Sequence, residues 1–215
     1  MANLITLSRL ALLLVIVAIA YQPPGPWQLV TVPLLILLFI TDALDGYVAR
    51  KWNEASLFGA MFDIAGDRVV ELTMWIILAD LDLVPVWVPL VFVFRGVFVD
   101  TIRASQASSH RQSPFSMMAS PLGNWLVAGK FMRIFYAVLK AVVFCWLMLI
   151  QPMPSVFEEF WATWGEAMSQ AGHVLVYLAV AICIIRGLPV IAEFVYSERH
   201  AILGTLAANG DSRDR

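Results

Sequence analysis

The sequence predicts an all-α integral membrane protein with six transmembrane helices and both termini in the cytoplasm. Three observations support this fold class. Hydrophobic residues make up 60% of the chain and charged residues only 14%, whereas a soluble domain is about half apolar and a quarter charged. Six apolar stretches are long enough to cross a bilayer, which takes about 20 residues. Lysine and arginine fall on one side of these stretches, and the positive-inside rule places the cytoplasm there.

Polar or helix-breaking segments separate the six stretches. QPPGPW divides the first from the second, and KWNEAS divides the second from the third. QPMPSVFEEFWATWGEAMSQAGH joins the fifth to the sixth, and we expect it to hold a short interfacial helix carrying Trp161 and Trp164. Another short interfacial segment is expected at the N-terminus, and residues 201–215 are expected to form a loose polar tail after a membrane domain of residues 1–200. The expected spans are residues 4–21, 28–49, 57–79, 84–103, 125–150 and 173–194.

The charged residues orient these spans. Basic residues lie near the start of the first span and after the second, fourth and sixth, whereas the three loops on the other side contain no lysine or arginine. Both termini and residues 41–67 therefore face the cytoplasm, and the expected location is a bacterial inner membrane. A cleaved signal peptide is the alternative for the first span, because LALLLVIVAIA ends in small residues. Only Arg9 carries a side-chain charge ahead of that core, and cleavage would disturb the charge pattern, so six spans are preferred.

Four aspartates interrupt the apolar sequence at the cytoplasmic side. Asp42 and Asp45 are three residues apart at the end of the second span, and Asp63 and Asp67 are four apart on the third. Residues three or four apart share a helix face, and the short connection makes these helices antiparallel neighbours, so the four carboxylates are expected to converge. Intramembrane acids are costly, and converging acids need either protons or cations. Oxygen-only ligands suit Mg²⁺, Mn²⁺ or Ca²⁺ rather than Zn²⁺, and a pair of such cations activates phosphoryl groups.

Small and basic residues accompany the acids on the same faces. Gly46 and Arg50 lie four and eight residues after Asp42. Gly59 lies four residues before Asp63. The glycines leave room for a ligand against the backbone, and Arg50 can bind a phosphate through its forked donors. Helix–helix packing is the alternative for the glycines alone, because small residues are common where membrane helices meet.

Together these positions spell D-x2-D-G-x2-A-R-x8-G-x3-D-x3-D over residues 42–67, which resembles the signature of the CDP-alcohol phosphatidyltransferase family. The resemblance implies an enzyme that moves a phosphatidyl group from CDP-diacylglycerol to an alcohol, releases CMP and forms homodimers; no nucleic-acid partner is expected. It implies two divalent cations, Mg²⁺ or Mn²⁺, with Asp67 also the candidate general base for the acceptor hydroxyl. The implied metal ligands are Asp42, Asp45, Asp63 and Asp67, and the residues implied to hold CDP are Asp45, Gly46, Ala49, Arg50 and Gly59.

Further segments resemble the phosphatidylglycerophosphate synthase branch of this family. NLITLSR is similar to its N-x2-T-x2-R opening, Arg95 and Arg103 keep its spacing of eight, and GK at 129–130 is similar to the start of its G-K-x-K-T-x2-Q segment. The resemblance implies glycerol 3-phosphate as the acceptor, with inositol phosphate, serine or another polar alcohol as alternatives. Gly96 stands where that branch has glutamate, and AGDR replaces ADK around the fourth aspartate. The candidate acceptor-binding residues are Arg95, Arg103, Lys130 and Arg133, for which snorkelling to lipid headgroups is the alternative.

The other intramembrane acids are expected to be structural. Asp100 can pair with Arg103 three residues later, and Glu71, four residues after Asp67, can pair with a buried basic group. Two other classes of protein remain: a cation transporter, because intramembrane acids also mark ion routes, and a membrane scaffold whose site has lost activity. The placement of both acid pairs at the cytoplasmic side and the intact signature favour the transferase.

Overall fold

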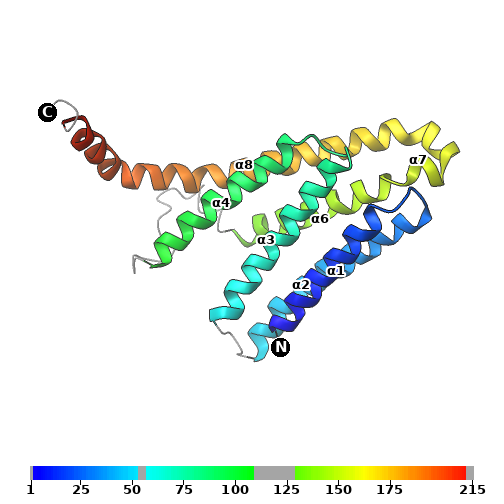
Figure 1. Cartoon of the computed structure of the whole chain (residues 1–215), viewed down its shortest axis with the longest axis horizontal. Helices are drawn as coiled ribbons and strands as arrows, with labels where there is room; N and C mark the ends of the chain where they lie inside the picture. The colour runs from blue at the N-terminus through cyan, green and yellow to red at the C-terminus, as the bar shows by residue number, and fades with distance from the viewer. Residues whose placement is uncertain (1, 53–56, 109–128, 212–215) are drawn as a thin grey trace. The chain divides into compact units, whose positions relative to one another are not determined.

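The computed structural model describes residues 2–52, 57–108 and 129–211, with side chains described for residues 6–42, 59, 61–102, 104, 129 and 131–196. Within these ranges the chain is helical apart from short turns and contains no strand, which confirms the all-α prediction. The elements, labelled in Figure 1, are α1 (Ala2–Ala20), η1 (Pro26–Val30), α2 (Thr31–Trp52), α3 (Leu57–Asp80), α4 (Trp87–Ser108), α6 (Lys130–Ile150), α7 (Met153–Val156) and α8 (Glu158–Asp211).

The chain divides into two compact units, which we describe separately. The first unit comprises Met1–Val93 and Tyr136–Val180, and the second comprises Phe94–Phe135 and Ala181–Arg215. The first unit contains α1, η1, α2, α3 and parts of α4, α6 and α8, together with α7. In this unit α1 packs against both α2 and α3, and the three helices run side by side (Figure 1).

The last helix differs from the prediction. α8 runs from Glu158 to Asp211, so the expected interfacial segment and the sixth span form one helix, which continues beyond residue 200 where a loose tail was expected. The stretch EEFWATWGEAMSQAG is polar but rich in the helix formers Glu, Ala, Met and Gln. Glu158 and Glu159 also occupy the first turn, where negative charge favours the helix dipole. The polar residues of this stretch therefore lie on an exposed face of a helix rather than in a loop.

Close packing on α6 explains why this polar start of α8 is ordered. A Cβ atom on Gly172 would lie 3.2 Å from Leu147 of α6, so the glycine permits a close approach of the two helices. Trp146 donates its indole Nε1 proton to the carbonyl of Met168 at 3.1 Å. Trp161 and Trp164, which were expected on a separate interfacial helix, lie in the first two turns of α8.

Aromatic side chains dominate the core of the first unit. Trp75 of α3 is fully buried and stacks on Phe92 of α4, with ring centroids 4.3 Å apart. Phe144 of α6 meets the same indole edge to face at 4.9 Å. Such pairs stabilise a fold beyond the area they bury. This cluster fixes α3 against α4 and α6 and so holds the helix that carries two of the four signature aspartates.

The end of α3 has a sequence-encoded stop. Asp82 adopts a positive φ of 56°, and its amide bonds to the Ala79 carbonyl while the amide of Leu83 bonds to Leu78. This is the Schellman arrangement, in which the left-handed residue is usually glycine or asparagine. Aspartate tolerates that conformation better than most residues. This stop sets the length of α3 and therefore the distance between the end of the helix and the acids near its start.

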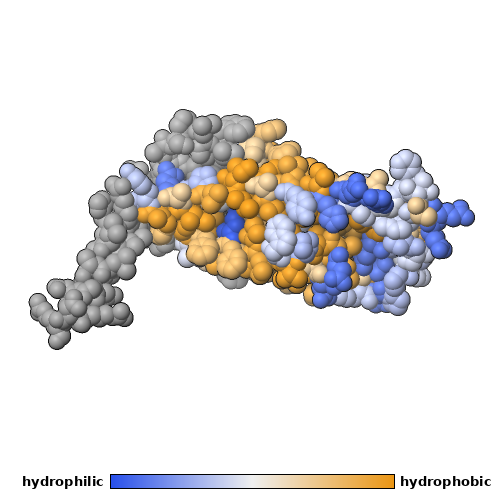
Figure 2. Space-filling view, turned by 90° about the horizontal axis from the view of Figure 1, so that it is seen from above, coloured by the Kyte–Doolittle hydropathy of each residue, from blue (hydrophilic) through white to orange (hydrophobic). Residues whose placement is uncertain are grey.

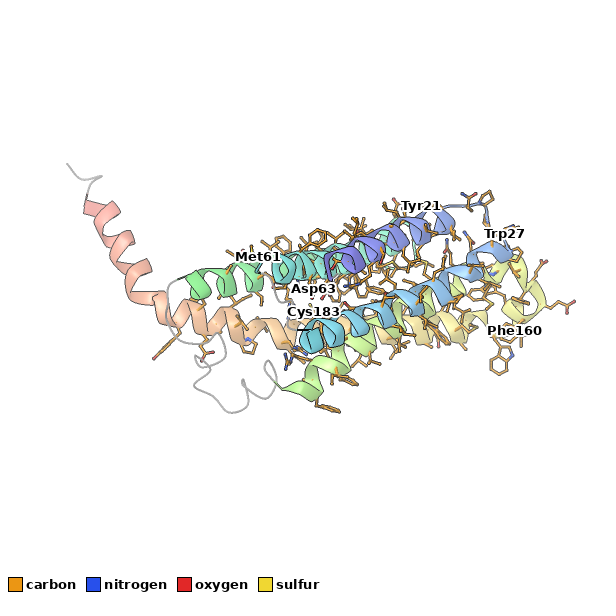
Figure 3. The ribbon with its side chains drawn as sticks, turned by 90° about the horizontal axis from the view of Figure 1, so that it is seen from below. Tyr21, Trp27, Met61, Asp63, Phe160 and Cys183 are labelled. Carbon is orange, nitrogen blue, oxygen red and sulfur yellow. The ribbon has the colours of Figure 1, made fainter. Side chains whose placement is uncertain are left out.

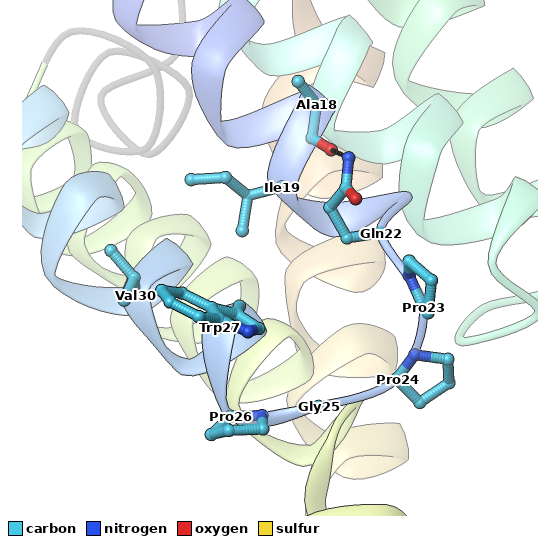
Figure 4. A pocket seen from close by; sticks show the side chains of 9 residues that line it. All are labelled: Ala18, Ile19, Gln22, Pro23, Pro24, Gly25, Pro26, Trp27 and Val30. Atoms are coloured by element: carbon cyan, nitrogen blue, oxygen red, sulfur yellow. Dashed lines mark hydrogen bonds between the residues drawn. The ribbon is translucent and has the colours of Figure 1, made fainter.

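The link between α1 and α2 forms a pocket of about 820 Å³ at the opposite end of α1 from Arg9 (Figure 4). Buried Gln28 ties the link together by donating to the carbonyls of Ala20 and Gln22, and Gln151 donates to the same Ala20 carbonyl. None of the lining residues is charged, so the pocket offers no group for phosphoryl chemistry. They are Ala18, Ile19, Gln22, Pro23, Pro24, Gly25, Pro26, Trp27 and Val30.

The surface fits a membrane protein. Large apolar side chains such as Leu14, Ile64 and Ile76 are more than half exposed, and Figure 2 shows apolar side chains over much of the described surface in that view. Soluble monomers rarely expose such extensive apolar area. Among the described residues, two helices are long and apolar enough to cross a bilayer, Phe131–Val156 and Glu158–Tyr196. Shorter apolar helices cover Thr6–Ala20 and Pro26–Asp42.

Candidate metal and substrate site

Three of the four signature aspartates meet in the first unit. Asp42 comes from α2, and Asp63 and Asp67 come from successive turns of α3. One carboxylate oxygen of each lies within 4.8 Å of the others. Figure 3 shows Asp63 on the inner side of α3, opposite the exposed Met61. The predicted convergence of the two helices is therefore present for the three acids whose side chains the structure describes.

The remaining signature residues fall largely outside the described side chains. The backbone of α2 passes through Asp45, Gly46, Ala49 and Arg50, but their side chains belong to the part of the chain that the structure does not describe. Gly59 is described and lies on α3, one turn before Asp63 on the same helix face. The roles expected for these residues therefore stay predictions.

Arg9 lies between the three acids. The sequence pattern did not predict that Arg9 belongs to this site. Its Nη2 atom is 2.6 Å from Oδ1 of Asp42 and 2.8 Å from Oδ1 of Asp67. Its Nη1 atom is 3.6 Å from Oδ1 of Asp63. The Arg9 side chain is only 3% exposed, whereas the three carboxylates are about half exposed. The guanidinium group is therefore buried, whereas the carboxylates that contact it remain accessible to solvent.

A close helix contact brings Arg9 to this position. Thr6, one turn earlier on α1, is buried, and a Cβ atom on Gly66 of α3 would lie 2.7 Å from its Cγ2 atom. Gly66 is the glycine of the AGDR segment that contains the fourth aspartate. The N-x2-T-x2-R opening was the available signal, because its spacing places Thr6 and Arg9 on one face of α1.

We expect Gly66→Ala to destabilise the protein by about 1–3 kcal/mol, because β-branched Thr6 leaves no room for the added methyl group. Thermal unfolding of the full chain measures the effect. Gly96→Ala is the matched control, since a Cβ atom at Gly96 meets nothing within 4 Å. Equal unfolding temperatures for Gly66→Ala and the parent chain would show that α1 and α3 are not packed this closely.

Glu71 extends the charged stripe of α3 into the protein interior. It is 8% exposed and pairs with Lys140 of α6 at 2.8 Å and with Arg68 at 2.9 Å. Lys140 also lies over the ring of Tyr136, 4.7 Å from its centroid. The expected structural pairing of Glu71 is confirmed, and its principal interhelical partner is a lysine for which the sequence offered no role. The pairing of Asp100 with Arg103 stays a prediction, since the Arg103 side chain is not described.

The three acids fit a hard divalent cation. Ligand oxygens that share one Mg²⁺ or Ca²⁺ ion lie about 2.0–2.6 Å from it, so they lie no more than about 5 Å from one another, as these oxygens do. No histidine or cysteine belongs to this group among the described residues, and an all-oxygen donor set disfavours zinc. Arg9 already places one positive charge beside these oxygens.

Two of the four candidate acceptor residues have described side chains, both in the second unit. Arg95 packs its aliphatic stem against Gly187 of α8, and its buried Nε atom has no hydrogen-bond partner among the described residues. Arg133 is exposed. Arg186 is 6% exposed and donates a hydrogen bond to the carbonyl of Met132. The side chains of Arg103 and Lys130 lie outside the described set.

A family model described as CDP-alcohol phosphatidyltransferase matches residues 1–185, which is most of the chain and includes the whole of α2 and α3. The chain belongs to the CDP-alcohol phosphatidyltransferase family. Membership accounts for the spacing of the acids on α2 and α3, and it confirms the resemblance seen in residues 42–67.

Curated relatives in this family carry two kinds of name. A CDP-diacylglycerol--glycerol-3-phosphate 3-phosphatidyltransferase of Cereibacter sphaeroides is 35% identical over 86 residues, 39% of this chain and 38% of the relative. Its Arabidopsis thaliana namesake, numbered 2, is 29% identical over 136 residues, 59% of this chain and 58% of the relative. A Streptomyces coelicolor cardiolipin synthase (CMP-forming) is 26% identical over 184 residues, 83% of this chain and 81% of the relative. The chain thus spans less than two thirds of the first two relatives.

Proposed function

We propose that this protein transfers the phosphatidyl group of CDP-diacylglycerol to a polar alcohol and releases CMP, with glycerol 3-phosphate as the acceptor. The observation that carries the proposal is the convergence of Asp42, Asp63 and Asp67 from two helices to within 4.8 Å, in a chain of this family. The names of the Cereibacter and Arabidopsis relatives support glycerol 3-phosphate.

The acids are proposed to hold two divalent cations, Mg²⁺ or Mn²⁺. The proposed ligands are carboxylate oxygens, three of which come from Asp42, Asp63 and Asp67. Asp45 would be the fourth ligand residue. When bound, such cations polarise the phosphoryl oxygens and offset the charge on the departing CMP. Gly46, Ala49, Arg50 and Gly59 are proposed to hold the cytidine and diphosphate, since a glycine lets a ligand lie against the helix backbone and arginine binds phosphate through paired donors.

The chemical step needs one base from the protein. A new bond forms between the acceptor oxygen and the phosphorus of the phosphatidyl group, and the bond from that phosphorus to the CMP oxygen breaks. The acceptor proton goes to the Asp67 carboxylate. Asp67 suits this role because its side chain is 52% exposed, so an acceptor hydroxyl can reach the carboxylate from solvent.

A phosphate-bearing acceptor needs cationic donors, and the second unit supplies candidates. Arg95 has a buried Nε proton without a hydrogen-bond partner among the described residues, and buried donors are seldom left in that state. We propose that Arg95 binds the acceptor phosphate, together with Arg103, Lys130 and Arg133. Arg95→Lys should then raise the KM for glycerol 3-phosphate about tenfold or more, because lysine lacks the forked guanidinium donors.

A lipid acceptor is the second candidate. The Streptomyces relative, which covers more of this chain than the other two, is named a CMP-forming cardiolipin synthase. Cardiolipin contains two phosphatidyl groups on one glycerol, so making it with release of CMP requires phosphatidylglycerol as the acceptor. That reaction uses the same donor and the same bond changes, but its acceptor arrives through the bilayer rather than from water.

A panel of acceptors decides between these candidates. Purified full-length protein in lipid nanodiscs receives labelled CDP-diacylglycerol and either glycerol 3-phosphate, phosphatidylglycerol, inositol phosphate or serine, and the lipid products are separated. We expect phosphatidylglycerophosphate from glycerol 3-phosphate. Cardiolipin as the sole product would replace the proposed acceptor while keeping the chemistry, and no CMP with any alcohol would reject the proposed function.

The remaining features of the proposal concern the membrane. We propose six spans with both termini and the acid cluster on the cytoplasmic side of a bacterial inner membrane, because the basic residues follow the positive-inside pattern. α3 and α4 would span despite their charged residues, of which Glu71 is paired with Lys140. We also propose a homodimer. Cysteine labelling from each side of sealed vesicles tests the topology.

A further inference from the structure

We propose that Arg9 is a built-in counter-cation, which neutralises part of the acid cluster when no metal is bound and opposes metal binding electrostatically. The inference rests on the proposed function in one respect, that the acids bind divalent cations. It makes Arg9 a residue that neutralises charge in the acid cluster rather than a catalytic residue.

The charges in the site are unbalanced without a cation. Three carboxylates against one guanidinium leave a formal charge of −3 + 1 = −2 among the described groups. The three carboxylates have oxygens within 4.8 Å of one another, so they repel one another although solvent screens part of the repulsion at their half-exposed side chains. Without Arg9 the three carboxylates would carry a formal charge of −3. The electrostatic repulsion between α2 and α3 would then increase.

Arginine is suited to this role because it cannot lose its proton inside a protein. Its side chain is 3% exposed and lies under the acids, on a helix that close contact between Thr6 and Gly66 holds against α3. A buried guanidinium without acids would itself be costly. The acids and Arg9 therefore stabilise each other in the metal-free protein.

The contact geometry indicates neutralisation rather than orientation of the ligands. A guanidinium that fixes a carboxylate plane does so through two parallel hydrogen bonds. Here a single nitrogen, Nη2, contacts both Asp42 and Asp67, and Nη1 is 3.6 Å from Asp63. Neither Nη1 nor Nε donates a hydrogen bond to any described residue. Arg9 therefore does not hold any of the three carboxylates through a paired hydrogen bond.

The test compares unfolding temperatures with and without metal. Full-length protein in nanodiscs, without any CDP lipid, is melted in EDTA and in Mn²⁺ as wild type, Arg9→Gln, Arg9→Lys and Lys140→Gln. We expect Arg9→Gln to lower the unfolding temperature by about 6 °C or more in EDTA and by less than half as much in Mn²⁺, which also means tighter Mn²⁺ binding. Arg9→Lys keeps the charge and should resemble wild type.

Lys140→Gln is the matched control, because Lys140 is another cation of low exposure, 18% at the side chain, that pairs with a carboxylate in the same unit. It should lower the unfolding temperature equally in EDTA and in Mn²⁺. The inference is overturned if Arg9→Gln behaves like Lys140→Gln, or if it reduces the stabilisation by Mn²⁺, which is the result for a residue that orients the ligands.

Failure of the proposed function gives a different result. In that case wild type itself gains no stability from Mn²⁺ and releases no CMP, and the counter-cation inference falls with it. If instead wild type binds Mn²⁺ and releases CMP while Arg9→Gln shows no larger gain from Mn²⁺, only the role of Arg9 is rejected.

Discussion

Asp67→Asn is expected to reduce CMP release from CDP-diacylglycerol by about a thousandfold or more. The substitution removes both the proposed base for the acceptor hydroxyl, which is worth about 10²–10⁴-fold, and a negatively charged oxygen from the proposed metal ligands. The amide keeps the size of the side chain, and Asp67 is half exposed, so the fold should survive. CMP release at saturating acceptor and metal measures the loss.

Asp80→Asn is the control for this prediction. Asp80 is the last residue of α3 and accepts a hydrogen bond from Tyr21 at the other end of the helix from the cluster. Its loss removes a carboxylate from the same helix without touching the site, and activity should stay within about twofold. Comparable activity in Asp67→Asn and wild type would remove the base assignment and weaken the metal assignment.

Glu71→Leu should cost about 3–5 kcal/mol of stability, because it leaves Lys140 charged and unpaired in the interior. For a chain of this size that corresponds to a fall of roughly 6–20 °C in unfolding temperature. The ion pair is buried at its Glu71 end and partly buried at its Lys140 end, with the two side chains 9% and 18% exposed. Thermal unfolding in nanodiscs, with metal held constant, measures the change.

The double variant Glu71→Leu with Lys140→Met provides the comparison. Replacing both partners by apolar residues removes the unpaired charge, and such replacements are often neutral. We expect it to recover most of the lost stability. A double variant as unstable as the single one would mean that the ion pair is not what stabilises this part of the bundle.

Sequence reasoning predicted the helices and the convergence of the acids because both depend on local patterns. Apolar stretches and proline breaks predicted α1, α2, α3, α4 and α6 to within about five residues at each end. The i, i+4 spacing of Asp63 and Asp67 placed both on one face of α3, and the short connection to α2 brought Asp42 to them.

The errors and omissions concern contacts between segments far apart in the chain. α8 is continuous because its polar start packs on α6 through Gly172, which no local signal reveals. Arg9 reaches the acids because Thr6 fits against Gly66, 60 residues later in the sequence. Lys140 had no role in the sequence because its partner, Glu71, lies on another helix.

We propose that the aspartates of α2 and α3 hold divalent cations that support phosphatidyl transfer. The test measures CMP release from labelled CDP-diacylglycerol by the wild-type chain with glycerol 3-phosphate, first in EDTA and then across a Mn²⁺ titration. We expect no release in EDTA, saturable recovery with Mn²⁺, and one CMP for each phosphatidyl product. Full CMP release and lipid product in EDTA would contradict it.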